Sequence, residues 1–360
     1  MGLNEIVIVI PSLEPDKRLI IYVNELRSAG FRNIEVINDG SSESYQTIFS
    51  SLDAVVLHHE VNKGKGAALK TGYRWIQENL PDVKGIITAD SDGQHTVTDC
   101  IKLAEQLNDE RVLLLGARDF NLPNIPPKSR SGNKITSVIF KLLYGQYLQD
   151  TQTGLRAFPA SLLPFMIDVE GDRYEYEMKV LIACSRAKIP MVSIPIETVY
   201  ENNNEGTHFH PIRDSWRIYK VIFGSFFKFM GSSLVSMLVD QGLFNLLNLV
   251  VFTNGDAKKG ELILASTIMA RVVSAIVNFT LNRNLVFGKN EDGKKAFGKY
   301  AVLCIAIMLL SAGGTWLLSA IGMSSTIAKI IVDTLLYFVS YRVQEQWVFA
   351  NIGGRKNESL

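Results

Sequence analysis

The hydropathy of this chain changes abruptly near residue 220. Before that point, charged residues are spread throughout, and short apolar runs alternate with helical patterns. After it, four apolar stretches each reach the ~20 residues that a helix needs to cross the hydrocarbon core of a bilayer. They lie at about 226–252, 261–285, 299–321 and 325–348. Four such stretches with short polar connections favour membrane-spanning helices over buried helices of a soluble core. The sequence therefore predicts a soluble N-terminal half and a transmembrane C-terminal half.

The basic residues between the apolar stretches predict the orientation of the membrane half. The loop 288–299 carries four lysines, and the tail 351–360 contains Arg355 and Lys356. Lys and Arg accumulate in the loops that stay in the cytoplasm. We therefore expect an integral protein of the cell membrane, with the soluble half, the middle loop and both termini in the cytoplasm.

Charge and cysteine content exclude some classes of partner. The net charge of +1 gives no electrostatic argument for nucleic acid, so we expect no nucleic-acid partner. The three cysteines lie far apart and match no metal-binding or disulfide spacing. The expected partners include the lipid bilayer, and association of copies of the chain through the membrane half stays open.

The soluble half has the pattern of an α/β domain. Residues 5–10 form a buried, β-branched strand that we expect to end at Pro11, and residues 16–29 have helical periodicity. Further strands are expected at 33–37, 54–57 and 85–89, separated by helices. Strands that alternate with helices imply a mostly parallel, Rossmann-like sheet.

Two carboxylates follow directly after the predicted strand 85–89. Asp90 and Asp92 are one residue apart, and in an extended segment such residues point the same way. Both can therefore face one hard divalent cation, which takes a few carboxylate oxygens and completes its shell with water and substrate phosphates. Open α/β sheets bind ligands at the carboxyl ends of their strands, a location that suits a nucleotide diphosphate. The alternative for a short Asp-x-Asp is a solvated turn.

Two other loops at strand ends carry candidate residues. Asp39 follows the second strand, where its carboxylate could accept hydrogen bonds from a nucleobase, or simply form an Asx-turn or a helix N-cap. Gly64 and Gly66 allow the backbone to approach a ligand closely. Their loop lacks the Gly-Lys-Ser/Thr spacing of a phosphate-binding P-loop.

The order of these motifs resembles glycosyltransferase family 2. The motifs are Asn38-Asp39-Gly40-Ser41-Ser42, Asn62-x-Gly64-x-Gly66-Ala67, Ala89-Asp90-Ser91-Asp92-Gly93-Gln94, Gly116-Ala117-Arg118 and Gln152-Thr153-Gly154-Leu155-Arg156. Within that family, the soluble half looks like the polyprenyl-phosphate hexosyltransferases, the group of dolichyl-phosphate mannose synthase and bactoprenol glucosyltransferase. The membrane half resembles the four-span GtrA-like family.

The resemblance implies a fold and a division into domains. The fold is an α/β GT-A catalytic domain followed by an all-α transmembrane domain of four helices. The expected boundaries are 1–207 for the GT-A domain, 208–225 for an amphipathic interfacial helix and 226–350 for the GtrA-like domain. The interfacial segment combines basic, aromatic and apolar residues at helical spacing. Its expected lipid contacts are Arg213, Ser215, Trp216 and Arg217.

The resemblance also assigns roles to individual residues. Asp90 and Asp92 would hold Mg²⁺ or Mn²⁺ on the diphosphate, with Asp92, Arg118 and Arg130 as catalytic residues. The donor nucleotide would contact Pro11, Glu14, Asp39, Gly64, Gly66 and Asp90. The sugar and acceptor pocket would contain Gln94, Ser131, Lys134, Asp150, Gln152, Thr153, Arg156, Glu175 and Glu177. The aromatic residue that the family usually has two positions after Pro11 is missing here.

A phosphate acceptor makes chemical sense of the arginines. A phosphate monoester, with a second pKa of about 6, is already an anionic nucleophile at neutral pH. It therefore needs positioning and charge neutralisation, which the planar fork of arginine supplies. In the resembling family two arginines bind this phosphate, a role that falls here to Arg118 and Arg130.

The predicted function is metal-dependent, inverting transfer of a hexose from a nucleotide diphosphate sugar to polyprenyl phosphate, undecaprenyl or dolichyl. The product would serve cell-envelope glycan synthesis or protein glycosylation. UDP-glucose is the favoured donor, followed by GDP-mannose and then an N-acetylglucosamine donor. The alternatives are transfer to another lipid or glycan acceptor, and a non-catalytic transporter or scaffold for lipid-linked sugars.

Overall fold

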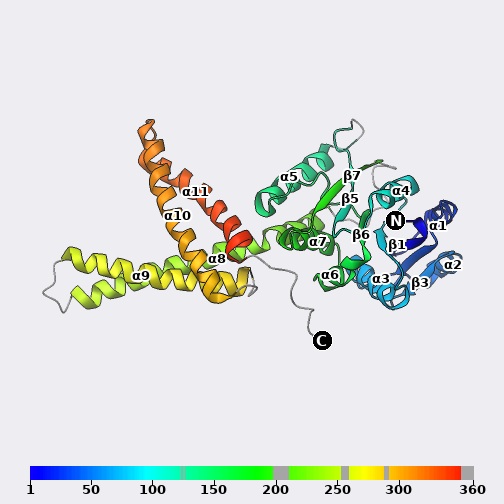
Figure 1. Cartoon of the computed structure of the whole chain (residues 1–360), viewed down its shortest axis with the longest axis horizontal. Coiled ribbons are helices and arrows are strands. Elements are labelled where there is room, and N and C mark those ends of the chain that lie inside the picture. Colours follow the sequence, from blue (N-terminus) through cyan, green and yellow to red (C-terminus); the bar gives the residue numbers. More distant parts are fainter. Residues whose placement is uncertain (123–124, 126, 198–210, 253–258, 288–291, 350–360) are drawn as a thin grey trace. The chain divides into compact units, whose positions relative to one another are not determined.

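The computed structural model describes residues 1–122, 125, 127–197, 211–252, 259–287 and 292–349 (Figure 1). The chain divides into two compact units, Met1–Ile222 and Phe223–Leu360. The first contains a β-sheet covered by helices, and the second is built of helices in its described residues.

The sheet of the first unit has seven strands in the order β3-β2-β1-β4-β6-β5-β7. Only β6 runs antiparallel to its two neighbours, and all other neighbouring pairs are parallel. The mostly parallel α/β fold is therefore as predicted. The strands are β1 (Ile6–Ser12), β2 (Asn33–Asn38), β3 (Val55–His58), β4 (Gly85–Thr88), β5 (Leu113–Arg118), β6 (Arg156–Pro159) and β7 (Met191–Ile196).

Helices cover both faces of this sheet (Figure 1). On one face α1 packs with α4, and on the other α3 packs with α6 and α7. The helices of the unit are α1 (Arg18–Ser28), α2 (Gln46–Ser50), α3 (Lys65–Asn79), α4 (Val97–Gln106), α5 (Pro127–Tyr144), α6 (Leu163–Asp168) and α7 (Glu175–Arg186). Short 3₁₀ turns lie at Leu3–Glu5, Glu43–Tyr45 and Ala160–Leu162.

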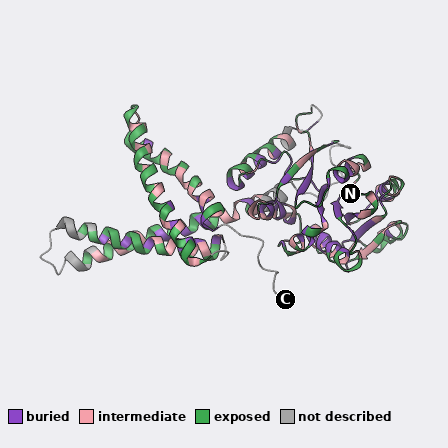
Figure 2. Ribbon diagram, viewed as in Figure 1, coloured by how far each residue is buried: buried purple, intermediate pink, exposed green. Residues whose placement is uncertain are grey.

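The central strands are buried on both faces, as Figure 2 shows. Every residue of β1 is buried. Ile8 and Ile10 belong to the apolar cluster that includes α1 and α4, whereas Val9 lies against Gly72 of α3. Burial on both faces explains why the strand is an uninterrupted apolar run rather than an alternating pattern.

Strand β1 continues past Pro11, which we expected to end it. Pro11 still pairs with Ile37 of β2, and the strand ends at Ser12. On the other side, the pairing of β4 with β1 stops at Val9. The carbonyl of Val9 accepts from Ala89, so Pro11, two residues further on, faces the side where β4 has ended. The N–H that proline lacks therefore has no strand partner to lose.

The second unit consists of two helical hairpins. The first is α8 with α9, the second α10 with α11. Their bounds are α8 (Pro211–Phe252), α9 (Lys259–Leu281), α10 (Gly293–Ala320) and α11 (Ser325–Val343). Helix α8 starts in the first unit, so the segment 208–225, predicted as a separate interfacial helix, is continuous with the first apolar helix from Pro211 onward. The side chains of 211–218, including the expected lipid contacts, lie outside the described residues.

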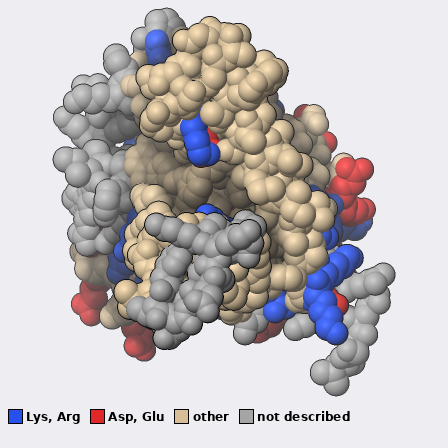
Figure 3. Space-filling view, turned by 90° about the vertical axis from the view of Figure 1, so that its left-hand side faces the viewer, with Lys and Arg blue, Asp and Glu red and all other residues tan. Residues whose placement is uncertain are grey.

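Two described helical segments, Tyr219–Leu247 and Gly293–Ala320, are long and apolar enough to cross a membrane. Large apolar side chains on this unit are exposed: Leu249, Trp316 and Ile321 are each more than 70% accessible. In Figure 3, few charged residues interrupt the surface at the centre of the view. Such a surface is unfavourable in water and suits a hydrocarbon environment.

The two hairpins end in the same way. After α9 and after α11 the chain forms a five-residue π-helical segment, Asn282–Val286 and Gln344–Val348. Asn282 and Gln344 occupy equivalent positions 62 residues apart, and their amides are hydrogen-bonded to each other at 2.9 Å. Phe287 and Phe349, five residues further on in each hairpin, stack on each other. The hairpins are thus an internal repeat.

Candidate active site

The candidate site lies where the parallel strands β1, β2 and β4 end. Asp39 follows β2, and Asp90 follows β4. Glu14 follows β1, and its N–H donates to the hydroxyl of Ser41 at 2.8 Å, which joins the loops after β1 and β2. The topology therefore brings several predicted residues to one edge of the sheet, because the carboxyl ends of parallel strands share that edge.

Asp90 is paired with a lysine that the sequence analysis did not select. The Nζ atom of Lys65 lies 2.6 Å from Oδ1 of Asp90 and 2.9 Å from Oε1 of Glu177. Burial alone would raise the pKa of Asp90, but the Lys65 ammonium outweighs it and lowers this pKa to about 2. Burial, followed by the charge of Asp90, raises the pKa of Asp92. Two close carboxylates in a partly enclosed place are suited to a cation.

His95 is a second residue that sequence reasoning missed. Its ring is buried, and Nδ1 accepts the backbone N–H of Asp90 at 3.0 Å. Burial lowers the pKa of His95. The ring is therefore neutral with its proton on Nε2, and it fixes the backbone that carries the Asp90 carboxylate. Nearby, the N–H of Gln94 donates to Oδ1 of Asp92 at 3.1 Å.

Asp39 holds the glycine loop in place. Its buried carboxylate accepts the backbone N–H groups of Lys63 at 2.9 Å and Gly64 at 2.8 Å. The third partner is Nδ1 of His59, at 2.7 Å. These contacts connect the end of β2 to the loop before α3. Lys65 follows that loop as the first residue of α3.

The glycines of this loop make room for the chain itself. Gly64 has a φ of 103°, and a Cβ there would overlap the carbonyl of Asp172. A Cβ on Gly66 would overlap the side chain of Tyr176. We expected close approach to a ligand at these positions. The structure shows that the close approach is made by residues 172–176, which include the start of α7.

The motif after residue 150 also reaches Asp90. A Cβ on Gly154 would overlap the carboxylate of Asp90, so only glycine leaves room for it. The hydroxyl of Thr88, the last residue of β4, donates to the carbonyl of Gly154 at 2.8 Å. The segment 152–156 and the Asp-x-Asp segment are thus packed against each other.

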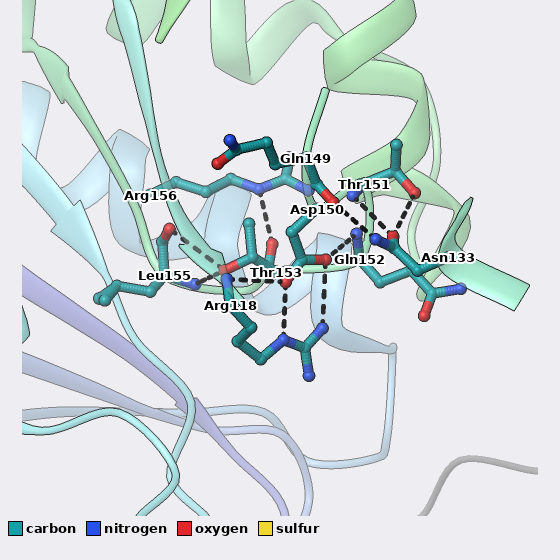
Figure 4. Close-up of polar contacts among 9 residues, drawn as sticks. All are labelled: Arg118, Asn133, Gln149, Asp150, Thr151, Gln152, Thr153, Leu155 and Arg156. Atoms are coloured by element: carbon teal, nitrogen blue, oxygen red, sulfur yellow. Dashed lines mark hydrogen bonds and ion pairs between the residues drawn. The ribbon is translucent and has the colours of Figure 1, made fainter. Parts of the chain in front are cut away.

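Arg118, at the end of β5, forms a bidentate ion pair with Asp150 (Figure 4). Its Nε donates to Oδ2 at 2.6 Å and its Nη2 to Oδ1 at 3.2 Å. Asp150 is fully buried and also accepts the N–H of Gln152 at 2.9 Å. This pairing fixes the plane of the guanidinium.

Arg156 connects this loop to α7. Its Nε donates to the carbonyl of Thr153 at 3.0 Å (Figure 4). Its Nη1 donates to the carbonyl of Glu177 at 2.9 Å. Glu177, which contacts Lys65, is therefore positioned by a residue of the predicted pocket. Glu175 instead accepts N–H groups of Asp172 and Arg173 next to the start of its own helix, at 3.4 and 3.3 Å.

The remaining predicted residues lie on α5. Arg130 donates from Nη2 to the carbonyl of Leu122 at 2.8 Å. Ser131 and Lys134 are exposed. No contact among the described residues joins this group to Asp90. The sequence-predicted site is therefore brought together around Asp90, while the α5 residues form a separate set on a neighbouring helix.

The described residues contain no cluster of three or more His, Cys, Asp or Glu side chains that could hold a metal. What the site offers instead is a pair of carboxylates. Oxygen donors of this kind fit Mg²⁺ or Mn²⁺ when water and substrate phosphates complete the shell.

The fold and this site define an α/β GT-A domain joined to a helical membrane domain. Two family models match the chain: glycosyl transferase family 2 over residues 7–168, and the GtrA/DPMS transmembrane domain over residues 228–349. The chain belongs to glycosyltransferase family 2 and carries a GtrA/DPMS membrane domain. It is therefore a glycosyltransferase and a membrane protein, as predicted, and the non-catalytic interpretation is not retained.

Three archaeal proteins are similar to this chain. An uncharacterised protein of Methanocaldococcus jannaschii is 33% identical, covering 55% of this chain and 82% of the relative. The UDP-N-acetylglucosamine–dolichyl-phosphate N-acetylglucosaminyltransferase of Methanococcus voltae is 31% identical, covering 54% and 86%. The glycosyltransferase AglJ of Haloferax volcanii is 25% identical, covering 60% and 70%.

Among solved structures, the glucosyl-3-phosphoglycerate synthase of Mycobacterium tuberculosis is similar to this chain at 15% identity and a TM-score of 0.45. The match covers 61% of this chain and 78% of that one.

Proposed function

We propose that this protein transfers a sugar from a nucleotide diphosphate sugar to a polyprenyl phosphate, with inversion at the anomeric carbon and with Mg²⁺ or Mn²⁺ as cofactor. The observation that carries the proposal is the Asp90–Asp92 pair at the carboxyl end of β4, in a family 2 domain attached to a membrane domain.

The acceptor is proposed from the membrane domain and from the relatives. The Methanococcus voltae relative is named for transfer to dolichyl phosphate, and it is 31% identical to this chain. Polyprenyl phosphates lie in the bilayer, where the second unit places apolar side chains on its surface. Transfer to another lipid or to a glycan remains the alternative.

The Methanococcus voltae relative also suggests which sugar nucleotide is the donor. Its name gives UDP-N-acetylglucosamine as the sugar nucleotide. We therefore rank UDP-N-acetylglucosamine first, ahead of UDP-glucose and GDP-mannose, although the sequence alone favoured UDP-glucose. Asp39 and Glu14 lie at the strand ends where the nucleotide would bind, with Pro11 behind them.

Each group of site residues has a separate role in the proposed reaction. A divalent cation bound at Asp90 and Asp92 would neutralise charge on the departing diphosphate. Arg118, oriented by the buried Asp150, would bind an anionic oxygen in a fixed plane. Because the acceptor phosphate is already a nucleophile, the site needs no general base to remove a proton. Arg130, Ser131 and Lys134 on α5 would contact the acceptor phosphate as it enters.

Pocket and membrane contacts complete the proposal. Gln94, Gln152, Thr153, Arg156, Glu175 and Glu177 would surround the sugar. The catalytic domain, with both termini, would lie on the cytoplasmic side, and residues 208–225 would run near the membrane surface. Copies of the chain could associate through the second unit.

The test uses the full chain purified in detergent with Mn²⁺ and dolichyl phosphate. UDP-N-acetylglucosamine, UDP-glucose and GDP-mannose are supplied separately, and released nucleotide and lipid-linked product are both measured. We expect turnover with a UDP-sugar, and a loss on the order of 100-fold or more for Asp92→Asn, because metal-bound charge stabilisation contributes several kcal/mol.

The matched control is Asp82→Asn, an exposed aspartate before β4 that should keep wild-type turnover. Full activity of Asp92→Asn, or no product with any donor, would contradict the proposal.

A further inference from the structure

Lys65 contacts the carboxylate oxygen of Asp90 that a divalent cation would have to bind. Its ammonium lies 2.6 Å from Oδ1 of Asp90, and its side chain is only 16% exposed. The other oxygen, Oδ2, lies against the backbone of Gly154, where no Cβ could fit. Both oxygens of this carboxylate are therefore flanked by the protein's own atoms.

The lysine has a second anchor. Glu177, on α7, lies 2.9 Å from the same ammonium, and its side chain is 14% exposed. Lys65 can therefore turn away from Asp90 and remain neutralised by Glu177. A partly buried ammonium without such an anchor would lose its partner and pay the cost of desolvation.

The backbone on both sides of Lys65 is firmly held. Asp39 accepts the N–H groups of the two preceding residues, and the carbonyl of Asp172 accepts the N–H of Ala67 at 2.9 Å. Movement of the ammonium must therefore come from the flexible side chain and not from the backbone. The local charge also favours exchange: the acidic groups Asp90, Asp92 and Glu177 outnumber the two cations that act on Asp90, Lys65 and Arg118.

From these contacts we infer that Lys65 is an internal counter-ion of Asp90. Its ammonium competes with the divalent cation for Asp90 and keeps only its contact with Glu177 when the cation binds. This inference rests on the metal site of the proposed function. It gives Lys65 a positioning role: it keeps the carboxylates neutralised before the cation and the nucleotide arrive. It also predicts that the empty and loaded forms differ in the partner of this one side chain.

The test measures Mn²⁺ binding to the full chain in detergent, by calorimetry or by the electron paramagnetic resonance of free Mn²⁺. Lys65→Gln should bind Mn²⁺ at least ~10-fold more tightly than wild type, since removal of one ion-pair competitor is worth about 1.4 kcal/mol or more. Lys63→Gln, which removes the same charge from an exposed position of the same loop, should change the affinity little.

Glu177→Gln gives the opposite result if Lys65 has two anchors. With only Asp90 left as its partner, Lys65 competes harder, and Mn²⁺ binding weakens. Loss of a nearby negative charge would also weaken binding, so the double variant Lys65→Gln/Glu177→Gln separates the two causes. In that background the Glu177 substitution should have little further effect.

A second readout is the melting temperature, measured first without metal. In the presence of a chelator, Lys65→Gln should melt at a lower temperature than wild type, because its carboxylates lose their counter-ion. Saturating Mn²⁺ should reverse this decrease in melting temperature. Equal Mn²⁺ affinity of wild type and Lys65→Gln, or equal melting in chelator, would overturn the inference. If neither protein binds Mn²⁺, the metal site of the proposed function fails, and the competition falls with it.

Discussion

At the scale of single residues, Glu35 is the most exceptional side chain in the core of the first unit. It lies on β2, next to the edge strand β3, and is 1% exposed. Neither of its carboxyl oxygens has a hydrogen-bond partner among the described residues. One oxygen faces Gly72 of α3. Burial raises the pKa of Glu35 to about 8, so the carboxyl is protonated at neutral pH.

This raised pKa makes stability depend on pH. The unfolded chain releases the Glu35 proton near its ordinary pKa of 4.5, whereas the folded chain retains it up to about 8. Protonated Glu35 therefore makes its full contribution to the stability of the folded state below pH 4.5. This contribution is lost as the pH rises through 8. Relative to wild type, Glu35→Gln should gain stability progressively between these values, by an amount on the order of 3 to 5 kcal/mol.

Thermal melting of both proteins from pH 5 to pH 9 measures this effect. Glu25→Gln, on the exposed face of α1, is the control and should show a constant difference from wild type. A difference between Glu35→Gln and wild type that does not change with pH would contradict the prediction.

The sequence predicts a site residue when its partners lie near it in the sequence. Asp90 and Asp92 were found because a strand, two carboxylates and a glycine follow one another. Lys65 was missed because its partners lie after β4 and on α7, and its glycine neighbours offered a sufficient explanation of the loop. Glu35 gave no signal either, since a single acid in a β-branched strand resembles the solvent side of an alternating pattern.

At the scale of elements, β1 to β4 and the four helices of the second unit lie where the pattern predicts them, whereas β5 and β7 were not predicted. The antiparallel strand β6 and the π-helical segments do not appear in the sequence pattern. Both depend on pairing between distant segments: β6 lies between β4 and β5, and Asn282 meets Gln344 across 62 residues. Such contacts are set by tertiary packing, which periodicity cannot report.

The amide contact between the hairpins should stabilise the second unit. Asn282 and Gln344 are buried, and Asn282 also contacts Ser232 and Asn278. Asn282→Leu leaves several polar groups unpaired and should lower stability by about 1–3 kcal/mol. Gln344→Leu should have a smaller effect, and the double variant should cost less than the sum of the two.

Melting of the purified chain in detergent provides the measurement. Gln241→Leu, which replaces an exposed amide on α8, serves as the control and should be near neutral. Strict additivity of the two buried substitutions would show that the amides do not act on each other.

At the scale of the whole molecule, the two units share one helix. The boundary between Ile222 and Phe223 lies inside α8. Within the first unit, the hydroxyl of Tyr144 on α5 donates to the carbonyl of Ile222 at 2.7 Å. The division into a soluble and a membrane half was visible in the hydropathy, but hydropathy gives no signal that one helix belongs to both.

The proposed orientation can be tested with introduced cysteines and a membrane-impermeant maleimide. Ser324→Cys lies in the turn between α10 and α11 and should react in intact cells. Ser44→Cys, exposed on the catalytic unit, should react only after permeabilisation. The native Cys100 and Cys184 are buried and contribute little background, and Cys304, which is exposed on α10, is replaced by serine in both variants. The reverse labelling pattern would contradict a cytoplasmic catalytic unit.

The reciprocal contacts of the hairpins have an evolutionary consequence. Phe279 of one hairpin meets Phe349 of the other, and Tyr341, the counterpart of Phe279, meets Phe287 in return. Two identical subunits related by a twofold axis make contacts of this kind. The membrane half thus has the arrangement of a fused homodimer, as expected if an ancestral gene for one self-associating hairpin was copied in tandem.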